Sequence, residues 1–188
     1  MTGIRYNNLI NIVWYQALWF TAILGQTTYE WALALLLLVH LLLVPNWRNE
    51  LKVMLACGLV GISADSMLTQ FGVYVFTPEP SLGAVPLPIP FWLMTIWIGF
   101  SGTLLHSFSF FMTRPILGTA IVAVVAPFSY MAGVRFGAVG FGPEAPTAML
   151  IIGAVWLCLM PLLGRISRVW RPDEDDAEDD TGPVFYFR

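Results

Sequence analysis

Charged residues are scarce in this sequence. Only 11% of the 188 residues are Asp, Glu, Lys or Arg, whereas 57% are hydrophobic. A soluble domain of this length has about a quarter of its residues charged. Seven of the twelve acidic residues also lie within residues 173–180, so the rest of the chain is mildly basic. The composition therefore indicates a protein whose solvent is lipid, and its charge gives no reason to expect nucleic acid as a partner.

Cysteine and the common catalytic motifs are also nearly absent. Cys57 and Cys158 lie in apolar segments without CxxC spacing, so we interpret them as buried free thiols. The sequence has no GxSxG, no HExxH, no phosphate-binding glycine loop and no three metal ligands at a plausible spacing. We therefore expect no metal and no cofactor. Whether the protein is an enzyme is left open.

Long apolar segments are plentiful and set the fold class. A helix needs roughly 20 mainly apolar residues to cross the hydrocarbon core. Strand alternation is missing, which argues against a transmembrane β-barrel. We predict an all-α polytopic bundle of six transmembrane helices, with spans at residues 8–25, 30–45, 53–75, 90–112, 116–136 and 146–164.

The basic residues predict how the chain is threaded. Eight of the nine Lys and Arg residues fall on one side of the six spans, and only Arg135 falls on the other. Because basic residues concentrate in cytoplasmic loops, both termini are expected in the cytoplasm. Residues 1–171 then form the transmembrane domain, and the acidic residues 172–188 form a disordered cytoplasmic tail. The predicted location is a bacterial cytoplasmic (inner) membrane.

Asp65 is the most unusual residue inside a predicted span. It lies thirteen residues beyond Lys52 and eleven before Phe76, about 20 Å and 17 Å from them at the helical rise. An unpaired carboxylate near the bilayer centre costs at least about 2.5–3.5 kcal/mol on insertion scales. We therefore expect Asp65 to face other helices and to be protonated or paired.

Small and polar residues accompany Asp65 on its helix and on the fourth predicted span. Gly58, Gly61 and Asp65 form one narrow row, and Gly99, Gly102 and His106 form another. We predict that these two rows meet. Further polar residues from other spans are expected in a layer between the membrane centre and the cytoplasmic face, and the candidate binding residues are Gln16, His40, Asp65, Ser66, His106, Ser129 and Tyr130.

Two interpretations compete for this layer. In the first, Asp65 is neutral or hydrogen-bonded to Ser, Thr or Tyr, and His106 is an interhelical donor; such bonds average about 0.6 kcal/mol. In the second, Asp65 and His106 form a pair that binds a ligand or exchanges protons. We favour the structural reading for His40 and Gln16, and the functional one for Asp65 with His106, because central carboxylates are rare without a function.

Four motifs resemble a known family. They are "QALWFTAILG" at 16–25, "ADS" at 64–66, "LHSFSFFMTRP" at 105–115 and "APFSYMAGVRFGAV" at 126–139. In this order and spacing they resemble a family of small uncharacterised bacterial inner-membrane proteins, a domain of unknown function, over about residues 7–165. The resemblance implies a helical membrane protein without an established activity, so it assigns no role to any residue.

Three functions therefore stay open. The first is an accessory or lipid-pathway protein whose polar layer binds a lipid headgroup or a small amphipathic molecule. The second is a small proton-coupled transporter that uses Asp65, and the third is an enzyme with Asp65 and His106 as acid and base. The expected partners are membrane lipids, and a second copy of the chain, as in a homo-oligomer, or other membrane proteins are the alternatives. A cavity that opens sideways to lipid would favour the first or third function, and one that reaches water alternately on both sides would favour transport.

Overall fold

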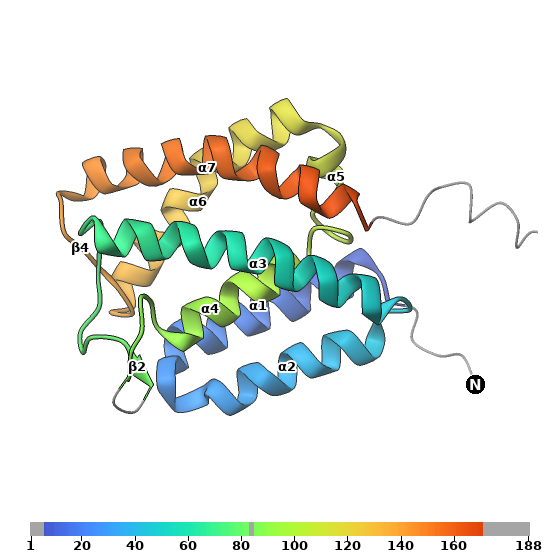
Figure 1. The fold of residues 1–188 in the computed structure, drawn as a ribbon, viewed down its shortest axis with the longest axis horizontal. Helices are drawn as coiled ribbons and strands as arrows, with labels where there is room; N and C mark the ends of the chain where they lie inside the picture. The colour runs from blue at the N-terminus through green and yellow to red at the C-terminus, as the bar shows by residue number, and fades with distance from the viewer. Residues whose placement is uncertain (1–5, 83–84, 171–188) are drawn as a thin grey trace, which may run out of the picture.

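The computed structural model describes residues 6–82 and 85–170, and the described chain is mostly helical. The acidic tail predicted at 172–188 lies outside the described residues. Figure 1 shows the helices packed side by side in a bundle. The helices are α1 (Asn8–Gly25), α2 (Glu30–Leu43), α3 (Trp47–Gln70), α4 (Phe91–Ser101), α5 (Ser109–Thr113), α6 (Pro115–Arg135) and α7 (Ala145–Arg168), and the 3-10 turn η1 (Gln26–Tyr29) joins α1 to α2.

Four helical stretches are long and apolar enough to cross a membrane. They are Asn8–Leu43, Trp47–Gln70, Pro115–Arg135 and Ala145–Arg168. The first contains α1 and α2, which fold back on each other, since the Trp14 indole N–H donates to the Leu36 carbonyl at 2.8 Å. Large apolar side chains on the outer faces are widely exposed, including Leu42, Ile116 and Leu150. The described chain is therefore mainly helical, as predicted, and its apolar helices are compatible with a membrane protein.

The fourth predicted span, residues 90–112, is not one helix. α4 ends at Ser101, a series of turns follows, and α5 begins at Ser109. At the break the Asn11 side chain donates to the Gly102 carbonyl at 2.9 Å. A Cβ at Gly102 would lie 3.0 Å from His40 Nε2, so glycine allows the neighbouring helices to approach. Irregular backbone at membrane depth is tolerated where protein surrounds it and satisfies its polar groups.

The third predicted span, residues 53–75, is displaced along the chain. The Asn46 side chain caps α3 by accepting from the Asn49 amide at 3.3 Å, so the helix begins at Trp47. It ends at Gln70, and Gly72 then adopts a positive φ of 72°. Asp65 consequently lies five residues from the end of α3, roughly 8 Å along the axis. The expectation that it sits at the middle of its span is corrected.

Two short strand pairs close the end of the bundle where α3 finishes. The turn after α3 holds β1 (Tyr74–Val75), which pairs with β4 (Gly140–Phe141) between α6 and α7. β2 (Ser81–Leu82) pairs with β3 (Val85–Pro86) within the proline-rich loop. The β1–β4 pair ties the end of α3 to the end of α6.

α3 and α4 pack closely through glycines on α3. A Cβ added to Gly61 would overlap the Trp97 indole, and one added to Gly58 would crowd Ile98. Gly99 of α4 instead faces Leu18 of α1. The small-residue row of α3 therefore meets α4, as predicted, but it contacts large side chains rather than the glycine row of α4.

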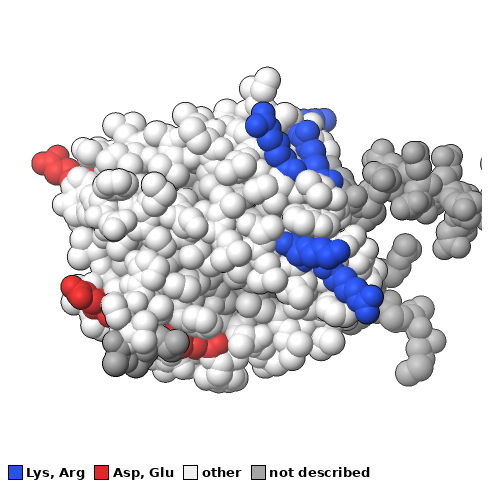
Figure 2. All heavy atoms as spheres, viewed as in Figure 1, with Lys and Arg blue, Asp and Glu red and all other residues white. Residues whose placement is uncertain are grey.

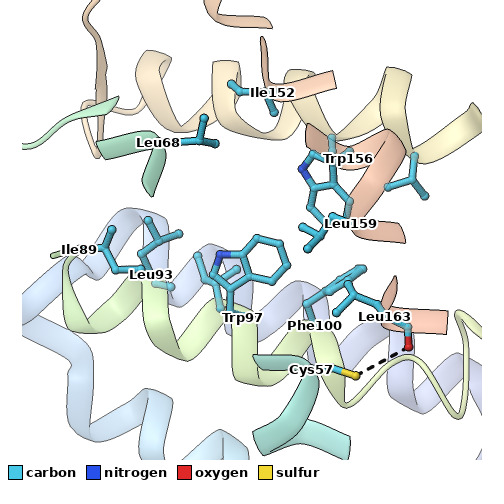
Figure 3. Close-up of a cluster of buried hydrophobic side chains, with 14 of the residues drawn as sticks. Cys57, Leu68, Ile89, Leu93, Trp97, Phe100, Ile152, Trp156, Leu159 and Leu163 are labelled. Atoms are coloured by element: carbon cyan, nitrogen blue, oxygen red, sulfur yellow. Dashed lines mark hydrogen bonds between the residues drawn. The ribbon is translucent and has the colours of Figure 1, made fainter. Parts of the chain in front are cut away.

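Aromatic and aliphatic side chains from α3, α4 and α7 meet in the core (Figure 3), and α1, α2 and α6 add further buried side chains. The rings of Trp97 and Trp156 stack at 5.3 Å between centroids with an angle of 19°. The Cys57 thiol is buried and bonds the Leu163 carbonyl at 3.8 Å, whereas Cys158 is exposed. The expectation of two buried thiols is thus correct for Cys57 and wrong for Cys158, which lies on the outward face of α7.

Charge is separated between the two ends of the molecule. In Figure 2 the visible Lys and Arg side chains gather at the end where α3 begins and α7 finishes, and the visible Asp and Glu side chains lie at the opposite end. Surface without Lys, Arg, Asp or Glu side chains fills the space between them. This pattern matches a bundle whose middle faces lipid and whose ends face water.

Candidate functional sites

Two buried carboxylates mark two separate polar clusters. Asp65 and Glu50 both belong to α3 and are 2% and 3% exposed. Fifteen residues separate them, which is about 22 Å along the helix. α3 therefore presents one carboxylate near each end, and each has its own neighbours.

Asp65 accepts hydrogen bonds from two aromatic side chains. The Trp97 indole N–H of α4 donates to Oδ2 at 2.7 Å, and the Tyr130 hydroxyl of α6 lies 2.9 Å from both carboxylate oxygens. Asp65 and Tyr130 therefore lie at the same level of the bundle, near the end of α3. The carboxylate is thus fixed by donors from two other helices and does not face the lipid.

Tyr74 extends this cluster. Its ring stacks on Tyr130 with centroids 5.0 Å apart and an angle of 7°. Its buried hydroxyl has no hydrogen-bond partner among the described residues. Burial raises the pKa of Tyr74 above its usual range, and the nearby Asp65 acts in the same direction, so the phenol stays neutral.

A cavity of about 440 Å³ adjoins this cluster. Trp97 and Tyr130 form part of its wall, so Asp65 stands behind them rather than in the lining. Ser129 adds a hydroxyl, and the remaining wall is mainly aromatic and aliphatic. Such a volume, with few polar groups in an apolar wall, is typical of small-molecule sites.

The cavity reaches the side of the bundle. Tyr15 and Trp19 of α1 line it together with Ile121 and Val125 of α6. Ile121 and Val125 are 37% and 57% exposed, and Ser129, four residues further on, is exposed too. These three residues form one stripe on α6. The opening therefore lies along the outer, apolar face of α6.

The second cluster joins two histidines to one carboxylate. His40 Nε2 of α2 lies 2.9 Å from Glu50 Oε1, and His106 Nε2 lies 3.1 Å from Glu50 Oε2. His106 belongs to the turns between α4 and α5. The break in the fourth predicted span thus brings an imidazole to the beginning of α3.

A hydrogen-bonded group from the start of α1 supports these histidines. The Tyr6 hydroxyl lies 2.7 Å from His40 Nδ1, and the Asn11 amide donates to that hydroxyl at 2.8 Å. Trp14 stacks on the His40 ring at 4.0 Å and 15°. Burial raises the pKa of Tyr6 to about 12, and the Asn11 hydrogen bond only partly opposes this effect, so the phenol is neutral at physiological pH.

The structure divides the predicted site residues between several places. Asp65, Ser129 and Tyr130 lie at or beside the cavity, whereas His40 and His106 join Glu50. The proposed Asp65–His106 pair is not formed, because each residue has other partners. Gln16 is exposed on α1, and the Ser66 hydroxyl bonds the Ile62 carbonyl of its own helix at 2.6 Å.

Glu50, Tyr6, Asn11 and Trp97 are participants that the sequence did not suggest. Glu50 falls between two predicted spans and is flanked by Arg48 and Lys52, which is typical of a solvated loop. The one available indication was Asn46 four residues earlier: asparagine often caps the start of a helix, which would place Glu50 in the first turn of a helix rather than in a loop. Nothing in the sequence marked Trp97 as a partner of Asp65, because a tryptophan in an apolar span is usually a core residue.

Comparison with known proteins places the chain in a family. Residues 8–162 match the family described as Protein of unknown function (DUF2878), and the chain belongs to it. This confirms the resemblance to a family of unknown function. No curated protein and no solved structure matches the chain.

Proposed function

We propose that this member of the unknown-function family is an accessory or lipid-pathway protein of the bacterial cytoplasmic membrane that binds a membrane amphiphile in the cavity beside Asp65. The observation that carries the proposal is the lateral opening of the cavity along α6. In a bilayer that face meets acyl chains. A ligand would therefore enter from the lipid.

The chemistry of the cavity wall defines the ligand. Aromatic and aliphatic side chains suit an acyl or isoprenoid chain, and the hydroxyls of Ser129 and Tyr130 suit one polar group on it. Asp65 would act indirectly, because its hydrogen bonds to Trp97 and Tyr130 hold both rings in the wall.

The proposed threading has six passes with both termini in the cytoplasm. α1, α2, α3, α6 and α7 would each make one pass, and α4 with the following turns and α5 would make another. The separation of charge in Figure 2 supports this orientation, because its basic end is the end where α7 finishes.

The two alternative functions receive less support. A proton-coupled transporter needs a site that reaches water, but Asp65 is enclosed by Trp97 and Tyr130, and the neighbouring cavity opens sideways. An acid–base enzyme of the predicted kind needs Asp65 beside His106, which bonds Glu50 instead.

Photo-crosslinking tests the proposal. Cells that express the protein are fed a fatty acid carrying a diazirine and an alkyne, irradiated, and the labelled fraction of the purified protein is measured. Ala126→Phe fills the cavity from α6, and we expect it to lower labelling several-fold. Val124→Phe places the same side chain on the exposed face of the same helix and should leave labelling unchanged.

Mapping the crosslinked peptides gives a second criterion that holds even if Ala126→Phe folds poorly. In the wild-type protein, labels should concentrate on cavity-lining segments of α1 and α6. Uniform labelling of all outward helix faces would contradict the proposal, as would equal labelling of the two Phe variants.

A further inference from the structure

We propose that His40, Glu50 and His106 form a binding site for a divalent transition metal, with Zn²⁺ as the ion that fits the donor set best. The inference does not depend on the cavity or on its ligand. The three residues come from α2, α3 and the turns after α4, so only the folded chain brings them together.

The donor atoms already converge. One ligand atom from each residue lies within 4.8 Å of the others, and both Nε2 atoms point at the same carboxylate, at 2.9 and 3.1 Å. Tetrahedral Zn²⁺ with bonds of about 2.1 Å places its ligand atoms roughly 3.4 Å apart. To reach that arrangement the two N···O contacts of 2.9 and 3.1 Å would lengthen by a few tenths of an ångström, and a separation of up to 4.8 Å would shorten.

The ligand set is chemically suited to Zn²⁺. Two imidazoles and one carboxylate are the protein ligands of many zinc sites, and three protein ligands leave a fourth position for water. His40 and Glu50 are almost fully buried, whereas His106 is 21% exposed. The exposed edge of His106 gives the ion a route to the site.

The surroundings of His40 resemble the outer shell of a metal site. Zinc-bound histidine usually uses its second ring nitrogen for a hydrogen bond that fixes the ring. His40 Nδ1 has such a partner in the Tyr6 hydroxyl at 2.7 Å, which Asn11 holds in turn. Trp14 stacks on the same ring. His40 is therefore held with Nε2 directed at Glu50.

A purely structural cluster is the competing explanation, because Glu50 alone satisfies one nitrogen of each histidine. A metal titration separates the two. The full-length protein is purified in detergent, stripped with EDTA and titrated with Co²⁺, whose visible absorption is intense in tetrahedral sites, and then with Zn²⁺ as competitor. We expect one equivalent of Co²⁺ to bind and Zn²⁺ to displace it.

Variants assign the site. Glu50→Gln and His106→Gln should each abolish stoichiometric uptake, and Tyr6→Phe should weaken it about 10- to 100-fold by removing the hydroxyl beside His40. Glu144→Gln changes an exposed acid before α7 and should have no effect. Circular dichroism checks that each variant is helical. If Glu50→Gln does not fold, the metal uptake of His106→Gln tests the site instead.

The result that overturns the proposal is equally definite. If the stripped wild-type protein binds no stoichiometric Co²⁺ or Zn²⁺, the cluster is a structural hydrogen-bonded group. Uptake that persists unchanged in folded His106→Gln places the metal elsewhere and also overturns the assignment.

Discussion

At the scale of single residues, Asp65 serves two donors, the buried Trp97 and the partly buried Tyr130. The Trp97 indole and the Tyr130 hydroxyl both come from other helices and both end on its oxygens. A buried donor that loses its acceptor costs more than the hydrogen bond contributed, because water does not replace the partner. The carboxylate oxygens therefore matter to folding as well as to the cavity wall.

Substitutions at Asp65 test this role. Asp65→Leu leaves both donors without an acceptor, and we expect it to lower the free energy of unfolding by roughly 1–3 kcal/mol for each. Asp65→Asn keeps one acceptor oxygen and should cost less. Thermal unfolding in detergent measures both, with Ser63→Ala as the control, since that exposed hydroxyl bonds only its own helix. Equal losses in the two Asp65 variants would contradict the assignment.

Residue types alone predicted part of this site. Asp65 and Tyr130 were identified because polar groups in apolar spans are rare, and the structure brings them into contact. The pairing of Asp65 with His106 was wrong because Trp97 lies beside Asp65, and His106, nine residues further on, reaches Glu50 near the other end of α3. Glu50 was missed because charge near a predicted loop usually faces water.

At the scale of elements, hydropathy located the helices well and their interruptions poorly. α1 spans Asn8–Gly25, the residues predicted for the first span. Between α4 and α5 the polar residues of segment 102–108 are interspersed with Leu and Phe and flanked by apolar helices, so a hydropathy average passes over the turns. Those turns depend on a side chain distant in sequence, Asn11, which bonds the Gly102 carbonyl. Local sequence does not contain that information.

The contact of α3 with α4 gives a prediction at the same scale. Gly61→Val places a branched side chain where the Trp97 indole lies, so α4 must move away from α3. We expect a loss of about 1–3 kcal/mol in the free energy of unfolding, measured by thermal unfolding in detergent. Leu59→Val alters an exposed position on the same helix and should change stability little. Unchanged stability of Gly61→Val would mean that the two helices are not in close contact.

At the scale of the whole molecule, the separation of charge predicts the orientation. Arg48 follows the start of α3 at the basic end, and Glu79 lies in the loop between β1 and β2. In a protein with Cys57→Ala and Cys158→Ala, we expect Glu79→Cys to react with a membrane-impermeant maleimide in intact spheroplasts. Arg48→Cys should react only after lysis, because the proposed threading places its end in the cytoplasm. The reverse labelling would invert the proposed threading.

Because the cavity opens sideways along α6, the proposed amphiphile would fill it from the surrounding bilayer. A molecule that arrives through the hydrocarbon is first concentrated there by partitioning, so its mole fraction among the surrounding lipids sets the degree of saturation. The total amount of that molecule in the cell then counts for less than the composition of the leaflet around each copy of the protein.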